Sequence, residues 1–127
     1  MRQIKFRGRR LDNGEWVYGD LIHIDKSDIG IVTDYDHWKG CRVDPATIGQ
    51  FTGLTDKNGK EIYEGDIVEA YDCDKEFAFM GAVRYSLPDV AFAIDKGTGG
   101  ALEPFEGCMT YEVVGNFHDN PSLLNEK

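Results

Sequence analysis

The sequence contains few cysteines and no long apolar run, and each absence excludes a class of protein. Its three cysteines, Cys41, Cys73 and Cys108, are odd in number and widely spaced, which argues against the disulfide framework of a small secreted domain. The longest apolar stretches are far too short to cross a bilayer, and no apolar segment follows the basic N-terminus as in a signal peptide. We therefore expect a cytoplasmic protein without a membrane partner, whose cysteines act as small core residues.

Helical periodicity is also nearly absent. No window of a dozen residues places apolar side chains at i, i+3, i+4 and i+7 without an interrupting Gly or Pro. Alternation with period two is common instead, as where Ile4 and Phe6 fall on one face of an opening strand. Further strands are predicted over residues 16–24, 29–33, 47–52, 67–71, 77–85, 90–94 and 111–117. Short strands between Gly, Pro and Asn turns predict a mainly β protein, a small β-barrel or sandwich with little helix.

The turn sequences locate the hairpins. Asp12-Asn13-Gly14 predicts a hairpin near the N-terminus, and Asn58-Gly59 suits a hairpin turn of type I′. Gly65-Asp66 before an apolar run is similar to the start of a strand in SH3-like barrels, which predicts an SH3-like C-terminal half. Ser122 is expected to cap at most one turn of helix.

The chain shows no internal repeat and no linker-like stretch. We therefore expect a single domain over residues 1–127. Within it, the turn pattern allows an N-terminal β lobe over about 1–54 and an SH3-like barrel lobe over about 55–119.

The charge is unevenly distributed along the chain. The sequence has 23 acidic and 14 basic residues and a net charge of −9, so its surface as a whole repels a phosphate backbone. The first ten residues nevertheless hold five basic residues and no acidic one. Either this strand pairs with acidic neighbours in the fold, or Arg7, Arg9 and Arg10 form a basic edge that binds nucleic acid or an acidic partner.

No metal or cofactor is expected. Asp72, Asp74 and Glu76 imitate the start of a calcium loop, but the sixth position is Phe77 where such a loop needs Gly. The histidines and cysteines lack the short spacings of zinc sites. A solvated acidic turn is the better interpretation of this segment.

A catalytic role is disfavoured but stays open. His37 lies close to Cys41 and next to Asp36, so a small hydrolase with a Cys/His or carboxylate site is an alternative. The Gly-x-Ser-x-Gly elbow of many hydrolases is absent. In the same segment, Tyr35 and Trp38 are two large aromatic residues of a predicted loop, and they are candidates for a partner-facing patch.

Three segments match a known family in their order along the chain. They are Met1-Arg2-Gln3-Ile4-Lys5-Phe6-Arg7 at the start, QFTGLTDKNGKEIYEGDIV over residues 50–68, and EVVGNF over residues 112–117 with Asn120-Pro121 and Leu123-Leu124 behind it. With these segments the chain resembles the YopX family, whose members are encoded by bacteriophages and prophages. Residues 25–47 and 72–108 carry no part of this resemblance.

The resemblance implies a mainly β phage or prophage protein of unknown biochemical function, acting in the cytoplasm of the bacterial host, and it supplies no catalytic residues. The central segment has a structural interpretation, a hairpin followed by a Gly-Asp turn into a core strand. A ligand-binding role for Lys60, Tyr63 or Asp66 is the alternative. The leading functional hypothesis is a non-enzymatic accessory protein that binds a protein partner or associates with itself.

Overall fold

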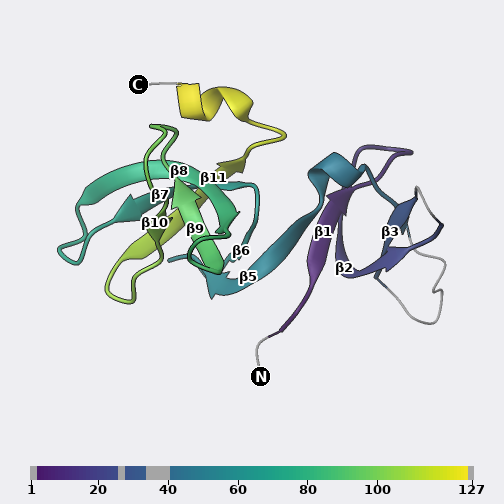
Figure 1. Cartoon of the computed structure of the whole chain (residues 1–127), viewed down its shortest axis with the longest axis horizontal. Coiled ribbons are helices and arrows are strands. Elements are labelled where there is room, and N and C mark those ends of the chain that lie inside the picture. The colour runs from purple at the N-terminus through teal and green to yellow at the C-terminus, as the bar shows by residue number, and fades with distance from the viewer. Residues whose placement is uncertain (1–2, 26–27, 34–40, 126–127) are drawn as a thin grey trace. The chain divides into compact units, whose positions relative to one another are not determined.

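The structure, a computed structural model, describes residues 3–25, 28–33 and 41–125 (Figure 1). Its strands are β1 (Phe6–Arg9), β2 (Trp16–His23), β3 (Ile29–Val32), β4 (Cys41–Arg42), β5 (Gly49–Thr55), β6 (Glu61–Tyr63), β7 (Asp66–Tyr71), β8 (Phe77–Ser86), β9 (Ala91–Asp95), β10 (Glu103–Pro104) and β11 (Thr110–Asn116). Two short 3-10 helices, η2 (Pro45–Thr47) and η3 (Pro121–Asn125), complete the described elements. The prediction of a mainly β protein with little helix is confirmed.

The strands form two antiparallel sheets. One has the order β4-β3-β2-β1-β5-β6 and the other the order β10-β9-β8-β7-β11. Neither sheet closes into a barrel through the strand pairs of the described residues. The chain divides into two compact units, residues 1–53 and 54–127. That the whole chain is a single domain, and that its second half is SH3-like, stay predictions.

The N-terminal unit is built on the predicted β1–β2 hairpin, in which Arg9 pairs with Trp16. Gly8 lets β1 pack closely against Val43, because a Cβ at this position would lie 3.0 Å from the Val43 side chain, which would then have to shift. The Asp44-Pro45 turn becomes η2, since the Asp44 carboxylate accepts a hydrogen bond from the backbone N–H of Ala46 at 3.0 Å.

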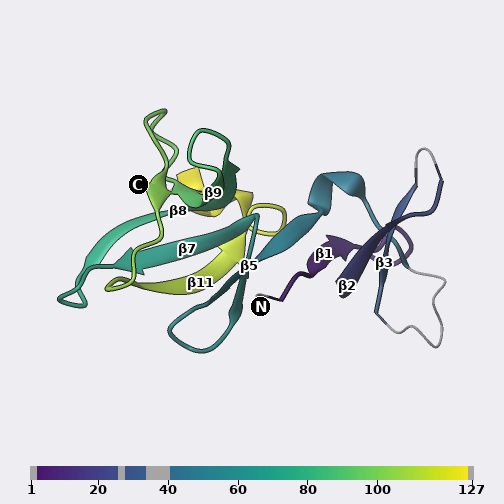
Figure 2. The same cartoon turned by 60° about the horizontal axis from the view of Figure 1, so that its bottom comes forward.

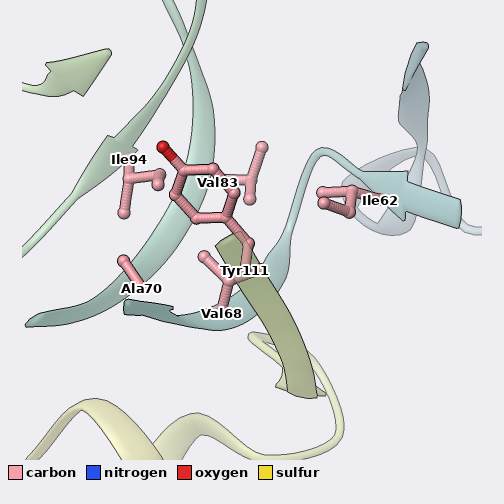
Figure 3. Packing of buried hydrophobic residues seen from close by; sticks show 6 residues of the cluster. All are labelled: Ile62, Val68, Ala70, Val83, Ile94 and Tyr111. Atoms are coloured by element: carbon pink, nitrogen blue, oxygen red, sulfur yellow. The ribbon is translucent and has the colours of Figure 1, made fainter. Parts of the chain in front are cut away.

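The core of the C-terminal unit draws on five strands. Its buried members are Ile62, Val68, Ala70, Val83, Ile94 and Tyr111 (Figure 3). The Tyr111 ring packs edge-on against Phe105, with ring centroids 4.8 Å apart. Its hydroxyl accepts a hydrogen bond from the backbone N–H of Glu106 at 2.9 Å, and burial raises the pKa of this hydroxyl. The polar end of a core aromatic is thus satisfied inside the fold.

Asp56 organises the predicted hairpin between β5 and β6. Its buried carboxylate accepts hydrogen bonds from the backbone N–H groups of Asn58 at 2.8 Å, Lys60 at 2.9 Å and Val113 at 3.0 Å. The third bond ties the turn to β11. The type I′ assignment is wrong: Gly59 has φ +82° but Asn58 does not have a positive φ, so glycine alone takes the left-handed conformation.

The Gly65-Asp66 turn has the structural role that its sequence indicates. Gly65 has φ +90°, its N–H donates to the Val83 carbonyl at 2.9 Å, and its own carbonyl accepts from the N–H of Phe117 at 2.7 Å. The buried Asp66 carboxylate accepts from the N–H of Tyr63 at 2.8 Å. This turn therefore joins the start of β7 to both β8 and the end of β11.

Two expectations require correction. Cys73 and Cys108 form a disulfide and both are exposed, so neither acts as a core residue; the pairing of β7 with β11, which spacing along the chain does not reveal, brings them together. Ser122 lies inside η3 and does not precede it. Asn120 holds the start of that helix instead, because its carbonyl accepts from the N–H of Leu123 at 3.1 Å.

Candidate protein-binding surface

The three arginines named as a basic edge do not form one patch. Arg7 and Arg9 lie on the same face of β1, and their guanidinium carbons lie 4.8 Å and 5.6 Å from the ring centre of Trp16. Arg7 is only 5% exposed. Arg10 bonds Asp12 through Nε and Nη2 at 2.9 Å and 2.7 Å, and this bidentate contact raises the pKa of Arg10. Binding of nucleic acid by these residues stays a prediction.

The other sequence-derived candidates are scattered or hidden. Tyr63 and Asp66 are each 2% exposed, so both side chains lie inside the C-terminal unit. Tyr35, Trp38 and the His37 of the suggested hydrolase fall outside the described residues. Binding roles for these side chains stay predictions.

Cys41 lies beside a hollow of about 420 Å³ in the N-terminal unit. The hollow is lined by Arg10, Leu11, Asp12, Cys41 and Arg42. Both of its guanidinium groups already have a carboxylate partner, since Arg10 pairs with Asp12 at 2.7 Å and Arg42 with Asp28 at 3.1 Å. The carboxylate that shares this hollow with the Cys41 thiol, that of Asp12, is thus held by Arg10. Over the described ranges, no three His, Cys, Asp or Glu side chains gather closely enough to hold a metal ion.

The β8–β9 hairpin carries an apolar face that continues beyond the core. Val83 pairs with Ile94, and both are buried. The next pair on the same face is Tyr85 with Phe92, whose rings meet edge-on at 5.4 Å; Tyr85 is 41% exposed. Beyond the last strand pair, Ser86 with Ala91, the turn begins with Leu87 and ends with Val90, which are 78% and 75% exposed.

The turn that holds these exposed side chains joins β8 to β9 (Figure 2), and two hydrogen bonds close it. The Val90 N–H donates to the Leu87 carbonyl at 3.2 Å, and the Ser86 hydroxyl donates to the Asp89 carboxylate at 2.9 Å. Pro88 fixes its own φ inside the turn. Val90 adopts φ +51°, a left-handed conformation that β-branched residues strongly avoid and that costs about 1 kcal/mol or more.

A hollow of about 470 Å³ lies beside this turn. It is lined by Tyr85, Ser86, Leu87, Pro88 and Asp89 from the hairpin and by Gly100, Ala101 and Leu102 from the segment before β10. Its rim is therefore apolar, with the Asp89 carboxylate as its one charged lining group. Apolar hollows with few polar groups are typical of binding sites. We define Tyr85, Leu87, Val90 and this hollow as the hairpin surface.

The strain at Val90 makes a testable prediction. Replacing Val90 with Gly removes the left-handed penalty and little buried surface, so the free energy of unfolding should rise by about 1 kcal/mol. Lys75, in the β7–β8 turn, also has a positive φ, +66°, but it is not β-branched. Lys75→Gly is therefore the matched control and should stabilise less in chemical denaturation. An equal or larger gain from Lys75→Gly would contradict strain specific to Val90.

The sequence analysis did not predict the hairpin surface, although the sequence contains a signal for it. The alternation of apolar residues continues up to the Pro88-Asp89 turn on both sides, through Leu87 and Val90. A strand that enters solvent at a turn usually ends in polar residues, so two apolar residues flanking a turn are informative. What the sequence did not show is that the buried core ends at the Val83–Ile94 pair, before the Tyr85–Phe92 pair and the turn.

Comparison with known proteins gives the chain its relatives. The structure is similar to that of protein EF1440 from Enterococcus faecalis, with a TM-score of 0.57 and 27% sequence identity over 98% of this chain and 99% of that one. No curated protein matches the chain. Among the described residues, no helix is long and apolar enough to span a membrane. The YopX protein family model matches residues 5–125, nearly the whole sequence, and the chain therefore belongs to the YopX protein family.

Proposed function

We propose that this YopX protein is a non-enzymatic protein-binding module of phage or prophage origin, which acts in the bacterial cytoplasm. Its docking site is the hairpin surface, and its partner is a protein segment that carries apolar and basic side chains. The observation behind the proposal is a cluster of apolar side chains at the end of the β8–β9 hairpin, where the partly exposed Tyr85 is followed by a turn that carries Leu87 and Val90 in solvent. Apolar side chains gathered in this way mark interaction sites.

The charge of the C-terminal unit supports a basic partner. Residues 54–127 hold 15 acidic and 6 basic side chains, whereas residues 1–53 hold 8 of each. The whole net charge of −9 thus belongs to the unit that carries the hairpin surface. Such a field attracts cationic segments and speeds their encounter, and it disfavours a phosphate backbone.

The turn itself also supports a binding role. Its hydrogen bonds from Ser86 to Asp89 and from Val90 to Leu87 hold the apolar side chains in place before any partner arrives. A preformed surface loses less conformational entropy on binding. Backbone strain such as that of Val90 is typical of functional sites, where it is retained despite its cost in stability.

A displayed library of random peptides, selected on the immobilised chain, tests this proposal. We expect the enriched peptides to combine Lys or Arg with apolar residues. Leu87→Asp should weaken their binding at least about tenfold, because it replaces an apolar contact with a buried charge. Leu11→Asp, at a 61% exposed position of the N-terminal unit, is the matched control and should bind as the wild type does. Thermal unfolding of both variants checks that they fold.

Several results would overturn the proposal. Enriched peptides that are acidic, or that bind Leu87→Asp as tightly as the wild type, would contradict a basic partner at this surface. Tight, salt-dependent binding of a single-stranded oligonucleotide would favour a nucleic-acid module instead. A wild-type dimer in light scattering that Leu87→Asp converts to a monomer would identify a second copy of the chain as the occupant.

A further inference from the structure

Cys73 and Cys108 face each other because of the register of the sheet. In the β7–β11 pair, Thr110 lies opposite Tyr71, and the same register continued by two residues sets Cys108 opposite Cys73. Their Cα atoms are 5.2 Å apart, within the range that a disulfide spans without movement of the backbone. The register of β7 and β11 therefore places the two cysteines at a separation that a disulfide can bridge.

Both cysteines are exposed, whereas Cys41 is half-buried and unpaired. An exposed disulfide is accessible to small thiols, and such bonds are the labile and regulatory ones. The bond joins positions 35 residues apart and closes a loop that contains β8, β9 and β10. The whole hairpin surface lies inside this loop.

We propose that Cys73 and Cys108 form a reversible thiol–disulfide pair that exchanges with low-molecular-weight disulfides and sets the stability of the enclosed β8–β9 hairpin. In the forward direction, one cysteine thiolate attacks glutathione disulfide, which forms a mixed disulfide and releases one glutathione. The second thiolate displaces the other glutathione and forms the internal bond. The protein loses two electrons and two protons, and one glutathione disulfide is reduced to two glutathiones.

The charges near the two cysteines determine which low-molecular-weight disulfide reacts with them faster. Four carboxylates lie within three positions of the two cysteines, those of Asp72, Asp74, Glu76 and Glu106, with Lys75 as the one nearby cation in sequence. Anionic glutathione disulfide is therefore repelled, while cationic cystamine is attracted. We expect cystamine to close the bond several-fold faster at low ionic strength, and added salt to remove the difference.

Redox titration of the Cys41→Ser chain tests the exchange. The chain is equilibrated with glutathione and glutathione disulfide at fixed ratios, trapped by alkylation and weighed by mass spectrometry. We expect two alkylated cysteines in reducing mixtures and none in oxidising ones. Amide hydrogen exchange in β8 and β9 should slow by about a hundredfold when the bond closes, because the closed loop destabilises the unfolded chain. Cys41→Ser with Cys73→Ser is the matched control and should gain no protection.

Two outcomes would overturn the inference. The thiols could stay open to alkylation in every mixture, or the bond could close without slowing exchange in β8 and β9. Neither measurement needs a binding partner. The two measurements therefore test the redox pair independently of the docking proposal. Control of docking by the bond rests on the proposed function, and it is tested by comparing the binding of enriched peptides to the oxidised and reduced chains.

Discussion

Replacing Asp56 with Asn should lower the free energy of unfolding by about 3 kcal/mol. The carboxylate accepts three backbone hydrogen bonds in a buried turn, and each bond to a charged acceptor contributes roughly 1.5–3 kcal/mol. An amide can keep the bonds at one oxygen, but its NH₂ group meets the N–H of Val113 as a second donor. Urea denaturation followed by circular dichroism measures the loss.

The pH dependence of this loss has a defined sign. Burial alone would raise the pKa of Asp56, but the hydrogen bonds from Val113, Lys60 and Asn58 outweigh it, and the pKa lies below its ordinary value of 3.8. The carboxylate therefore stabilises the fold fully above that value, and its contribution disappears as the pH falls below it. The difference between wild type and Asp56→Asn should shrink in that range. A difference that is constant down to acid pH would contradict the ionised carboxylate.

Asp12→Asn is the control for Asp56. Asp12 also accepts hydrogen bonds as a carboxylate, from Arg10, but its side chain is 64% exposed. An exposed ion pair contributes little to stability. We expect the denaturation midpoint of Asp12→Asn to match that of the wild type, which separates the effect of burial from that of removing one negative charge.

Removing the disulfide should have a comparable effect. The variant with both Cys73→Ser and Cys108→Ser should lose up to about 4 kcal/mol of unfolding free energy, the chain-entropy value for a closed loop of this length. Its denaturant slope should also increase, because the unfolded chain without the cross-link exposes more surface. Chemical denaturation measures both quantities. The wild-type chain is fully oxidised beforehand, and no oxidant or reductant is present during the measurement.

Cys41→Ser is the matched control for the double variant. Cys41 is the free cysteine and lies outside the loop that the disulfide closes. Its replacement should leave the midpoint nearly unchanged. If the double variant unfolds at the same denaturant concentration as the oxidised wild type, then the bond contributes nothing to the stability of the chain.

Local sequence was sufficient to predict most of the strands. Alternation with period two is a direct consequence of the pleat, so the extended segments near β2, β7, β8 and β11 could be placed without tertiary information. The hairpins could also be located from local sequence, because glycine marks turns that need a positive φ, as Gly14 and Gly59 both show. The short strands β4, β6 and β10 were missed because two or three residues do not make a pattern.

The candidate site was much less predictable. The charges of Arg7 and Arg9 are visible in the sequence, but their position over the Trp16 ring depends on which strand lies beside β1. The disulfide was missed because 35 residues separate its cysteines and only the pairing of β7 with β11 aligns them. Exposure of Leu87 and Val90 depends on where the core ends.

The sequence by itself determined the mainly β character and the positions of the tight turns, because these follow from the conformational preferences of neighbouring residues. Membership of the YopX family also follows from the sequence alone, since it rests on the match of residues 5–125 to the family model. The tertiary structure alone decided which strands pair, which carboxylates are buried and which apolar residues face solvent. Those properties arise from contacts between residues far apart in the chain, and the local pattern of a single sequence does not determine such contacts.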